Sequence, residues 1–175
     1  AIYILENQDF VIFANSNEKG QCSIVQSSNS ITYLLGYLKK DIIGKPIEVI
    51  MPSIFQEGHD KMLEIHIKKM HSQQNSQRES YRGSDKKETF ILPKTKMGYL
   101  TPLNAKFTVY DDNDFSDNFV IKAKMEAKDT KSVYAYYVLA KNDFSIDSIS
   151  SSALNLGLSM DLLKKYVVKM SVLVR

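Results

Sequence analysis

The sequence contains very little cysteine: Cys22 is the only one among 175 residues. A single cysteine excludes an internal disulfide framework and any metal site built from clustered cysteines. It also fits a protein that works in a reducing compartment. We therefore expect a cytoplasmic location, or a position on the cytoplasmic face of a membrane protein.

The sequence also lacks a long apolar run. No segment approaches the ~20 apolar residues that a membrane-spanning helix needs. The short apolar start at residues 1–5 is followed by Glu6 and Asp9, unlike a signal peptide. We expect no membrane segment in this chain. Because it begins at Ala1 and ends in an apolar run at Arg175, we expect it to be a piece of a longer polypeptide, which can itself be attached to a membrane.

Neither sign of charge dominates the chain. Lys and Arg total 23, Asp and Glu total 20, and the net charge of +3 comes from scattered basic residues. Nucleic acid is therefore not an expected partner. The sequence has no nucleophile elbow, phosphate-binding glycine loop or convincing carboxylate pair, so we expect no enzymatic activity. The apolar fraction of 43% can fill the core of one domain, with residues to spare.

The local patterns predict a mixture of strands and helices. β-formers dominate the segments expected to be strands, which are 10–15, 22–26, 89–92, 103–110 and 119–125. Serines that can cap a helix and glycines that can end one predict short helices at 31–35 and 39–43, followed by a further turn at 47–50. From about Gly58, apolar residues at helical spacing predict the longest helix, which continues to about Met70.

These elements predict an α+β fold, in which short helices and one longer helix are inserted between the second and third strands of a five-stranded antiparallel sheet. Pro102 indicates an edge or a bulge, because proline cannot donate a ladder hydrogen bond. Residues 72–88 are rich in serine, glutamine and charge, which is typical of a mobile loop. A tolerated surface insertion is favoured there over a cover for a pocket.

An internal repeat divides the chain. Residues 136–150 resemble the opening hairpin at 10–27, and residues 153–165 echo the helix, glycine, helix pattern at 33–44. The second copy stops where the rest of its helical crossover should follow. We therefore predict three parts, namely a lead-in at 1–9, a first domain at 10–131 and the incomplete front of a second, similar domain at 132–175.

Five short motifs carry a resemblance to a known family. They are Leu35-Gly36-Tyr37, the block from Asp41 to Pro46, Met51-Pro52, His59-Asp60 and the strand from Lys96 to Pro102. Their order and spacing resemble those of PAS sensor domains, over a stretch from about Phe10 to Ala127. The Met-Pro followed by His-Asp is similar to a subgroup that includes haem-binding oxygen sensors and many PAS domains of large ciliate and amoebal membrane proteins.

The resemblance implies a PAS fold and a non-catalytic module that senses a ligand or binds a protein, and thereby controls another domain. We expect its partners to be neighbouring domains of the same polypeptide or another protein, with a homodimer as a further option. A ligand in the pocket or a partner on the sheet would shift the population between conformations, and this shift would change how the strands contact a neighbouring domain. The alternative is an architectural tandem array of PAS units with filled cores, which assembles proteins without a ligand.

His59 is the sharpest candidate for a ligand-binding residue. The resemblance places it where the oxygen sensors carry their haem-ligating histidine, and imidazole is a good iron ligand. Haem at His59 would make the chain a gas or redox sensor, but the His59-Asp60 pair can also cap and orient a helix start without any metal. Thr89 stands where the oxygen sensors have an arginine beside bound oxygen. With His66 and His71 as the other histidines, none lies four residues from another, so a helical zinc pair is absent.

The remaining candidates describe an apolar pocket for which the sequence assures no cofactor. Pro46 and Ile47 stand where light-sensing members carry a reactive cysteine, so the blue-light adduct chemistry of flavin is not expected. Non-covalent flavin is left as a weaker option than haem. Cys22, on the second strand, fits a buried small hydrophobe better than a redox sensor. The residues expected to line the pocket are Ile47, Ile50, Met62, Leu63, Ile67, Ile91 and Ala105.

Overall fold

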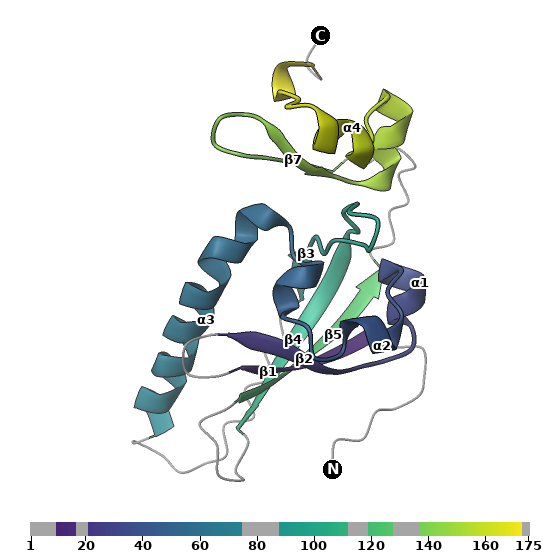
Figure 1. Cartoon of the computed structure of the whole chain (residues 1–175). Helices are drawn as coiled ribbons and strands as arrows, with labels where there is room; N and C mark the ends of the chain where they lie inside the picture. Colours follow the sequence, from purple (N-terminus) through teal and green to yellow (C-terminus); the bar gives the residue numbers. More distant parts are fainter. Residues whose placement is uncertain (1–9, 17–20, 75–87, 112–118, 128–136, 173–175) are drawn as a thin grey trace.

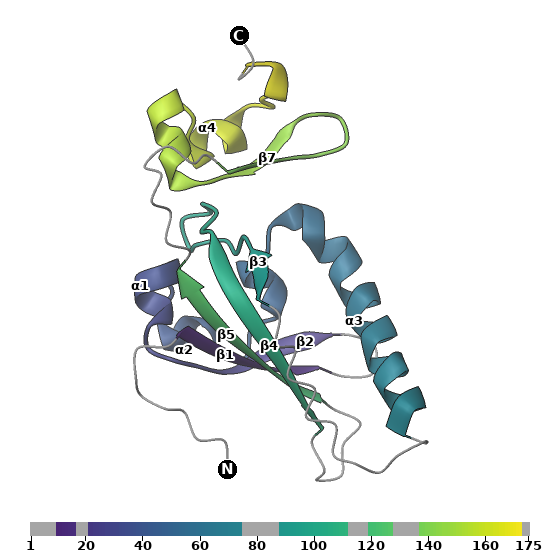
Figure 2. The same ribbon diagram turned by 180° about the vertical axis from the view of Figure 1, so that it is seen from behind.

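The main body of the protein is a five-stranded antiparallel sheet with strand order β2-β1-β5-β4-β3 (Figures 1 and 2). The computed structural model describes residues 10–16, 21–74, 88–111, 119–127 and 137–172. The strands are β1 (Phe10–Ser16), β2 (Cys22–Ser27), β3 (Thr89–Ile91), β4 (Leu103–Asp111) and β5 (Phe119–Ala127). The predicted α+β fold is confirmed, since the helices lie between β2 and β3 in the chain. Much of the polar segment 72–88 lies outside the described residues.

The sheet buries one face through alternation of side chains along each strand. Ile12 on β1 lies opposite Ala123 on β5, and Ala105 on β4 lies opposite Met125 on β5. All four side chains belong to the same buried cluster, because residues two apart on a strand point to the same side. Pro102 directly precedes β4, where its missing N–H removes no ladder bond.

Three short helical segments cross this buried face. They are α1 (Ile31–Leu35), α2 (Lys39–Ile42) and the 3-10 turn η1 (Ile47–Ile50). Gly36 ends α1 with φ +74°, and its N–H donates to the carbonyl oxygen of Thr32 at 3.0 Å. A left-handed conformation there suits glycine, as the sequence predicted. The Tyr37 hydroxyl donates to the carbonyl oxygen of Val49 at 3.1 Å, and burial raises the pKa of this phenol.

The long helix α3 (Ser53–Gln74) begins five residues before its predicted start near Gly58. The chain becomes helical directly after Pro52, whose carbonyl oxygen accepts the N–H of Phe55 at 3.0 Å. His59 therefore lies in the second turn of α3, so the interpretation of His59 and Asp60 as a cap at the helix start is wrong. In both views α3 lies beside the sheet (Figures 1 and 2). Within the described part of the chain, no helix has the length and apolar character that a membrane span requires.

A second, smaller unit follows the sheet. It contains the two-stranded sheet β6 (Val138–Ala140) and β7 (Ile146–Ile149), the 3-10 segment η2 (Ser151–Leu156), the helix α4 (Met160–Lys165) and the 3-10 turn η3 (Met170–Val172). Ile146, Ile149, Ala153, Leu158 and Met160 form its own buried cluster. The predicted boundary near residue 131 falls outside the described residues.

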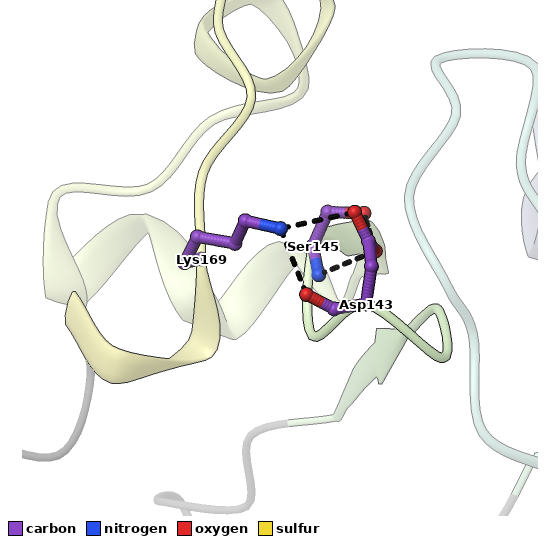
Figure 3. A network of polar contacts seen from close by, with 3 residues as sticks. All are labelled: Asp143, Ser145 and Lys169. Carbon is purple, nitrogen blue, oxygen red and sulfur yellow. Dashed lines mark hydrogen bonds and ion pairs between the residues drawn. The ribbon is translucent and has the colours of Figure 1, made fainter.

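A polar network links the turn between β6 and β7 to the segment that precedes η3 (Figure 3). The Asp143 carboxylate accepts hydrogen bonds from the Ser145 N–H at 3.0 Å and from the Ser145 hydroxyl at 2.6 Å. The Lys169 ammonium lies 3.0 Å from the same carboxylate and donates to the Asp143 carbonyl oxygen at 2.8 Å. The hydrogen bonds from Ser145 and from the Lys169 ammonium, with a smaller contribution from the Lys169 charge, lower the pKa of Asp143.

The two units share local geometry at the positions that the sequence repeat relates. Gly36 and Gly157 end their helical segments with φ of +74° and +75°. The hydroxyl oxygens of Ser28 and Ser30 lie 2.7 Å apart, as do those of Ser150 and Ser152. The main chain also repeats, since Ile24 N–H donates to the Lys45 carbonyl oxygen at 2.9 Å and Ile146 N–H donates to that of Val168 at 2.7 Å.

Candidate functional site

The first candidate site is a tight hairpin between β3 and β4, which we call the junction hairpin (residues 93–101). Its turn is closed by hydrogen bonds from the Thr95 N–H to the Tyr99 carbonyl oxygen and from the Gly98 N–H to the Thr95 carbonyl oxygen, each at 2.8 Å. Gly98 has φ +93°, a conformation that other residues rarely adopt.

One side of the junction hairpin is bonded to the short helices of the first unit. The Lys94 N–H donates to the carbonyl oxygen of Ile50 at the end of η1, at 2.7 Å, and the Lys96 N–H donates to that of Leu35 at the end of α1, at 2.8 Å. The Lys96 ammonium also lies 3.2 Å from the Asp41 carboxylate on α2. A displacement of η1 or α1 would therefore strain the hydrogen bonds that hold the hairpin, and would tend to displace the hairpin as well.

The other side of the junction hairpin is bonded to the second unit. The Leu100 N–H donates to the carbonyl oxygen of Ile149 at 2.8 Å, and Leu100 itself is only 2% exposed. Tyr99 packs against the buried cluster of the second unit, and its hydroxyl accepts the Met160 N–H at 3.4 Å. A further bond between the two units lies outside the hairpin, where the Ser53 hydroxyl at the start of α3 donates to the Asp147 carboxylate on β7. The hairpin thus touches both units through directional bonds.

The second candidate site is a cluster of three side chains that we call the His59 cluster (Glu48, His59 and Asp60). Glu48 comes from η1, while His59 and Asp60 are neighbours on α3. His59 Nδ1 lies 3.8 Å from Glu48 Oε1 and 3.6 Å from Asp60 Oδ1. Gln56 holds the two elements together, since its side-chain amide donates to the carbonyl oxygens of Glu48 at 3.0 Å and Met51 at 3.1 Å.

Two atoms of this cluster are buried without a hydrogen-bond partner in the part of the chain that the structure describes: His59 Nδ1 and Asp60 Oδ1. The His59 side chain is 18% exposed, and the carboxylate of Glu48 remains partly open to solvent. Burial of unpaired polar atoms costs roughly 1–3 kcal/mol each. Glu48 was not predicted from the sequence, because it is 11 residues from His59 and meets it only after the chain turns back at Met51 and Pro52.

The predicted pocket residues are brought together only in part. Ile50 and Ala105 are buried in the core cluster, and Ile47 and Ile91 pack against it. Leu63 is half-buried, and the side chain of Ile67 lies outside the described set. Met62 is 66% exposed, so its placement in the pocket lining is wrong. Met62 and Leu63 are adjacent on α3 and point about 100° apart around the helix axis. The orientation of α3 that partly buries Leu63 therefore leaves Met62 facing solvent.

The surroundings of His59 do not fit a haem. A porphyrin needs an apolar pocket. Met62, which was expected to supply part of the apolar wall, faces solvent, while Ile50 and Ala105 are buried in the core cluster. The donor set of one imidazole and two carboxylates instead suits a small cation.

Cys22 lies in the interior, as the sequence predicted. It is 5% exposed, and burial raises the pKa of its thiol to about 12, with smaller contributions from the Glu48 and Asp60 carboxylates. The thiolate is the reactive form of cysteine, so a neutral buried thiol is a poor nucleophile. This environment agrees with a small hydrophobic role for Cys22 rather than with a redox sensor.

Comparisons with known proteins give distant similarities in structure and none in sequence. No family model and no curated protein matches the chain. A PAS domain of an HTR-like protein from Haloarcula marismortui is 13% identical, with a TM-score of 0.44, and the match covers 70% of this chain and 84% of that one.

Two further solved structures are similar to the same degree. A PAS domain from Desulfitobacterium hafniense is 14% identical, with a TM-score of 0.46 and coverage of 71% and 94% of the two chains. The PAS-B domain of Drosophila melanogaster Cycle with bound ethylene glycol is 10% identical, with a TM-score of 0.45 and coverage of 67% and 99%. The likeness concerns the fold alone, and neither ligand nor activity follows from it.

Proposed function

We propose that this chain is a non-catalytic PAS sensory or protein-interaction module within a larger regulatory protein. In this proposal residues 10–131 form one PAS domain, and residues 132–175 form the front of a second PAS-like domain. A ligand or partner that shifts the helical segments of the first unit changes how that unit contacts the second. The partners are the neighbouring domains of the same polypeptide or another protein.

The observation that carries the proposal is the double attachment of the junction hairpin. Its Lys94 N–H is bonded to Ile50 in the first unit, and its Leu100 N–H is bonded to Ile149 in the second, with only five residues between the two donors. A short, well-bonded element that touches two cores can pass a displacement from one to the other. The matching geometry at Gly36 and Gly157 supports the reading of the second unit as a related domain.

The proposal is tested by hydrogen exchange of the full chain, measured residue by residue by NMR. Ile50→Ala removes side-chain volume where η1 meets the hairpin, and we expect faster exchange of the Leu100 and Ser150 amides than in the wild type. The Ile146 amide, which is bonded within the second unit, should change less. Tyr33→Ala is the matched control, because Tyr33 is 91% exposed on the neighbouring α1. Faster exchange confined to the first unit would contradict coupling between the units.

The second candidate function is an architectural tandem array without a ligand. It is favoured by the burial of Ile50 and Ala105 inside the core cluster, where a ligand pocket was expected. The two functions are separated by an NMR screen of small molecules against the wild-type chain. Ligand-induced shifts at Ile47 and Ile91 support sensing, whereas an absence of binding together with coupled exchange across the hairpin supports the architectural role.

A further inference from the structure

We propose that Glu48, His59 and Asp60 form a binding site for one divalent transition-metal ion, with Zn²⁺ as the representative ion. This inference does not depend on the proposed sensory function, because it rests only on the geometry of the His59 cluster. The three side chains each offer one ligand atom, and these atoms all lie within 4.8 Å of one another.

Two of the three spacings between the ligand atoms are close to those around a tetrahedral ion. Zinc binds histidine nitrogen and carboxylate oxygen at about 2.0–2.2 Å, which places two tetrahedral ligands about 3.4 Å apart. His59 Nδ1 lies 3.6 Å from Asp60 Oδ1 and 3.8 Å from Glu48 Oε1. A small closure of these side chains would bring each carboxylate oxygen to the same ion as His59 Nδ1.

A direct ion pair explains this spacing less well. A protonated imidazole draws a carboxylate to about 2.7–2.9 Å, the usual length of a charge-assisted hydrogen bond. Both carboxylates stand farther from Nδ1 than that, and neither Nδ1 nor Asp60 Oδ1 has a hydrogen-bond partner among the described residues. A cation between them would satisfy both atoms at once.

The donor set also indicates which class of ion the site takes. Mg²⁺ and Ca²⁺ prefer all-oxygen ligands, whereas imidazole together with carboxylate suits zinc and its neighbours in the first transition row. The three protein ligands leave a fourth position for water. The site lies near the surface, since the side chains of Glu48 and Asp60 are 24% and 46% exposed. The Gln56 bonds to Glu48 and Met51 fix the distance between η1 and α3, so they act as positioning contacts.

The test is isothermal titration calorimetry of the tag-free chain with ZnCl₂ at neutral pH. We expect one Zn²⁺ per chain, and an affinity at least about tenfold weaker in Glu48→Gln and in His59→Gln. The matched controls are Glu57→Gln, an exposed carboxylate on the same helix, and His71→Gln; both should bind Zn²⁺ as the wild type does. Mg²⁺ and Ca²⁺ at the same concentrations should produce no comparable heat.

A second measurement uses only the wild-type chain, so that it stands even if a variant fails to fold. Paramagnetic Co²⁺ should shift or broaden the amide resonances of Val49, Gln56 and Lys61 first. Perturbation centred on His66 or His71, equal Zn²⁺ affinity in Glu48→Gln and the wild type, or equal binding of Mg²⁺ would each overturn the proposal.

Discussion

The backbone N–H of Leu100 donates to the carbonyl oxygen of Ile149 at 2.8 Å, and this bond joins the junction hairpin to a member of the buried cluster of the second unit. Leu100 belongs to the strand-connecting hairpin of the first unit, while Ile149 is fully buried at the end of β7. The bond is supported by a parallel bridge between Leu100 and Ser150. The stability of the two units should therefore depend on the geometry of the hairpin.

Gly98→Ala should destabilise the chain through that hairpin. Gly98 has φ +93°, which costs a residue with a Cβ roughly 1–2 kcal/mol, and the added Cβ would contact the Met160 side chain at 3.5 Å. We expect a loss of about that size in the free energy of unfolding in urea. Gly58→Ala is the control, since Gly58 lies inside α3 with open space around it, and alanine there should stabilise by about 0.5–1 kcal/mol. Equal effects at both sites would contradict the prediction.

Leu103→Ala should be strongly destabilising. Leu103 is fully buried at the start of β4, so truncation leaves a cavity in the core cluster and should cost about 2–5 kcal/mol. Ile65→Ala removes a similar apolar side chain, but Ile65 is 67% exposed on the outer face of α3. We expect it to change the free energy of unfolding by less than about 0.5 kcal/mol. A large loss from Ile65→Ala would show that the outer face of α3 is covered in solution.

The Asp143 network should make the second unit sensitive to acid. Since hydrogen bonds from Ser145 and the Lys169 charge lower the pKa of Asp143 below its ordinary 3.8, the carboxylate contributes stability above that pH and loses it as the pH falls further. We expect NMR titration of Asp143 to show a depressed pKa that returns toward the ordinary value in Lys169→Met. Lys164→Met, an exposed lysine on α4, should leave the Asp143 titration unchanged.

Cys22 should react slowly with iodoacetamide at pH 8 in the folded chain. Its thiol is 5% exposed and its pKa is raised to about 12, so little thiolate forms. The raised pKa also implies stability that is complete below the ordinary value of 9.0 and falls as the pH rises toward 12. A cysteine introduced by Ser23→Cys, in a background with Cys22→Ala, should react rapidly, because Ser23 is exposed on the same strand. Comparable rates for the two thiols would contradict the buried environment.

Local chemistry made much of the fold predictable. Gly36 and Gly157 were recognisable as helix ends because glycine readily adopts a positive φ, and both residues have one in the structure. The period-two pattern around Ala105 identified a strand with one buried face. The start of α3 was missed because Ser53 to Glu57 do not show the apolar spacing from which the helix was predicted. Helix bounds are less well determined by such patterns than helix existence.

The candidate sites were less predictable, because each depends on contacts between distant parts of the chain. His59 was recognised from its position in a motif, whereas Glu48 meets it only through the fold and the Gln56 bonds. Met62 was assigned to the pocket with Leu63, although neighbours on a helix point in different directions. The attachment of Leu100 to Ile149 has no side-chain signature at all, since both partners are backbone groups.

The use of backbone groups alone for the attachment of the junction hairpin affects which mutations the chain tolerates. The bonds from Lys94, Lys96 and Leu100 that anchor the junction hairpin all use main-chain N–H groups, which every residue except proline possesses. Many side chains in the hairpin can therefore be substituted without loss of these main-chain hydrogen bonds. The restrictions lie at Gly98, at the partly buried side chain of Tyr99 and the buried side chain of Leu100, and in the exclusion of proline from the donor positions. Neighbouring units whose sequences have drifted far apart can still be held together by the same bonds.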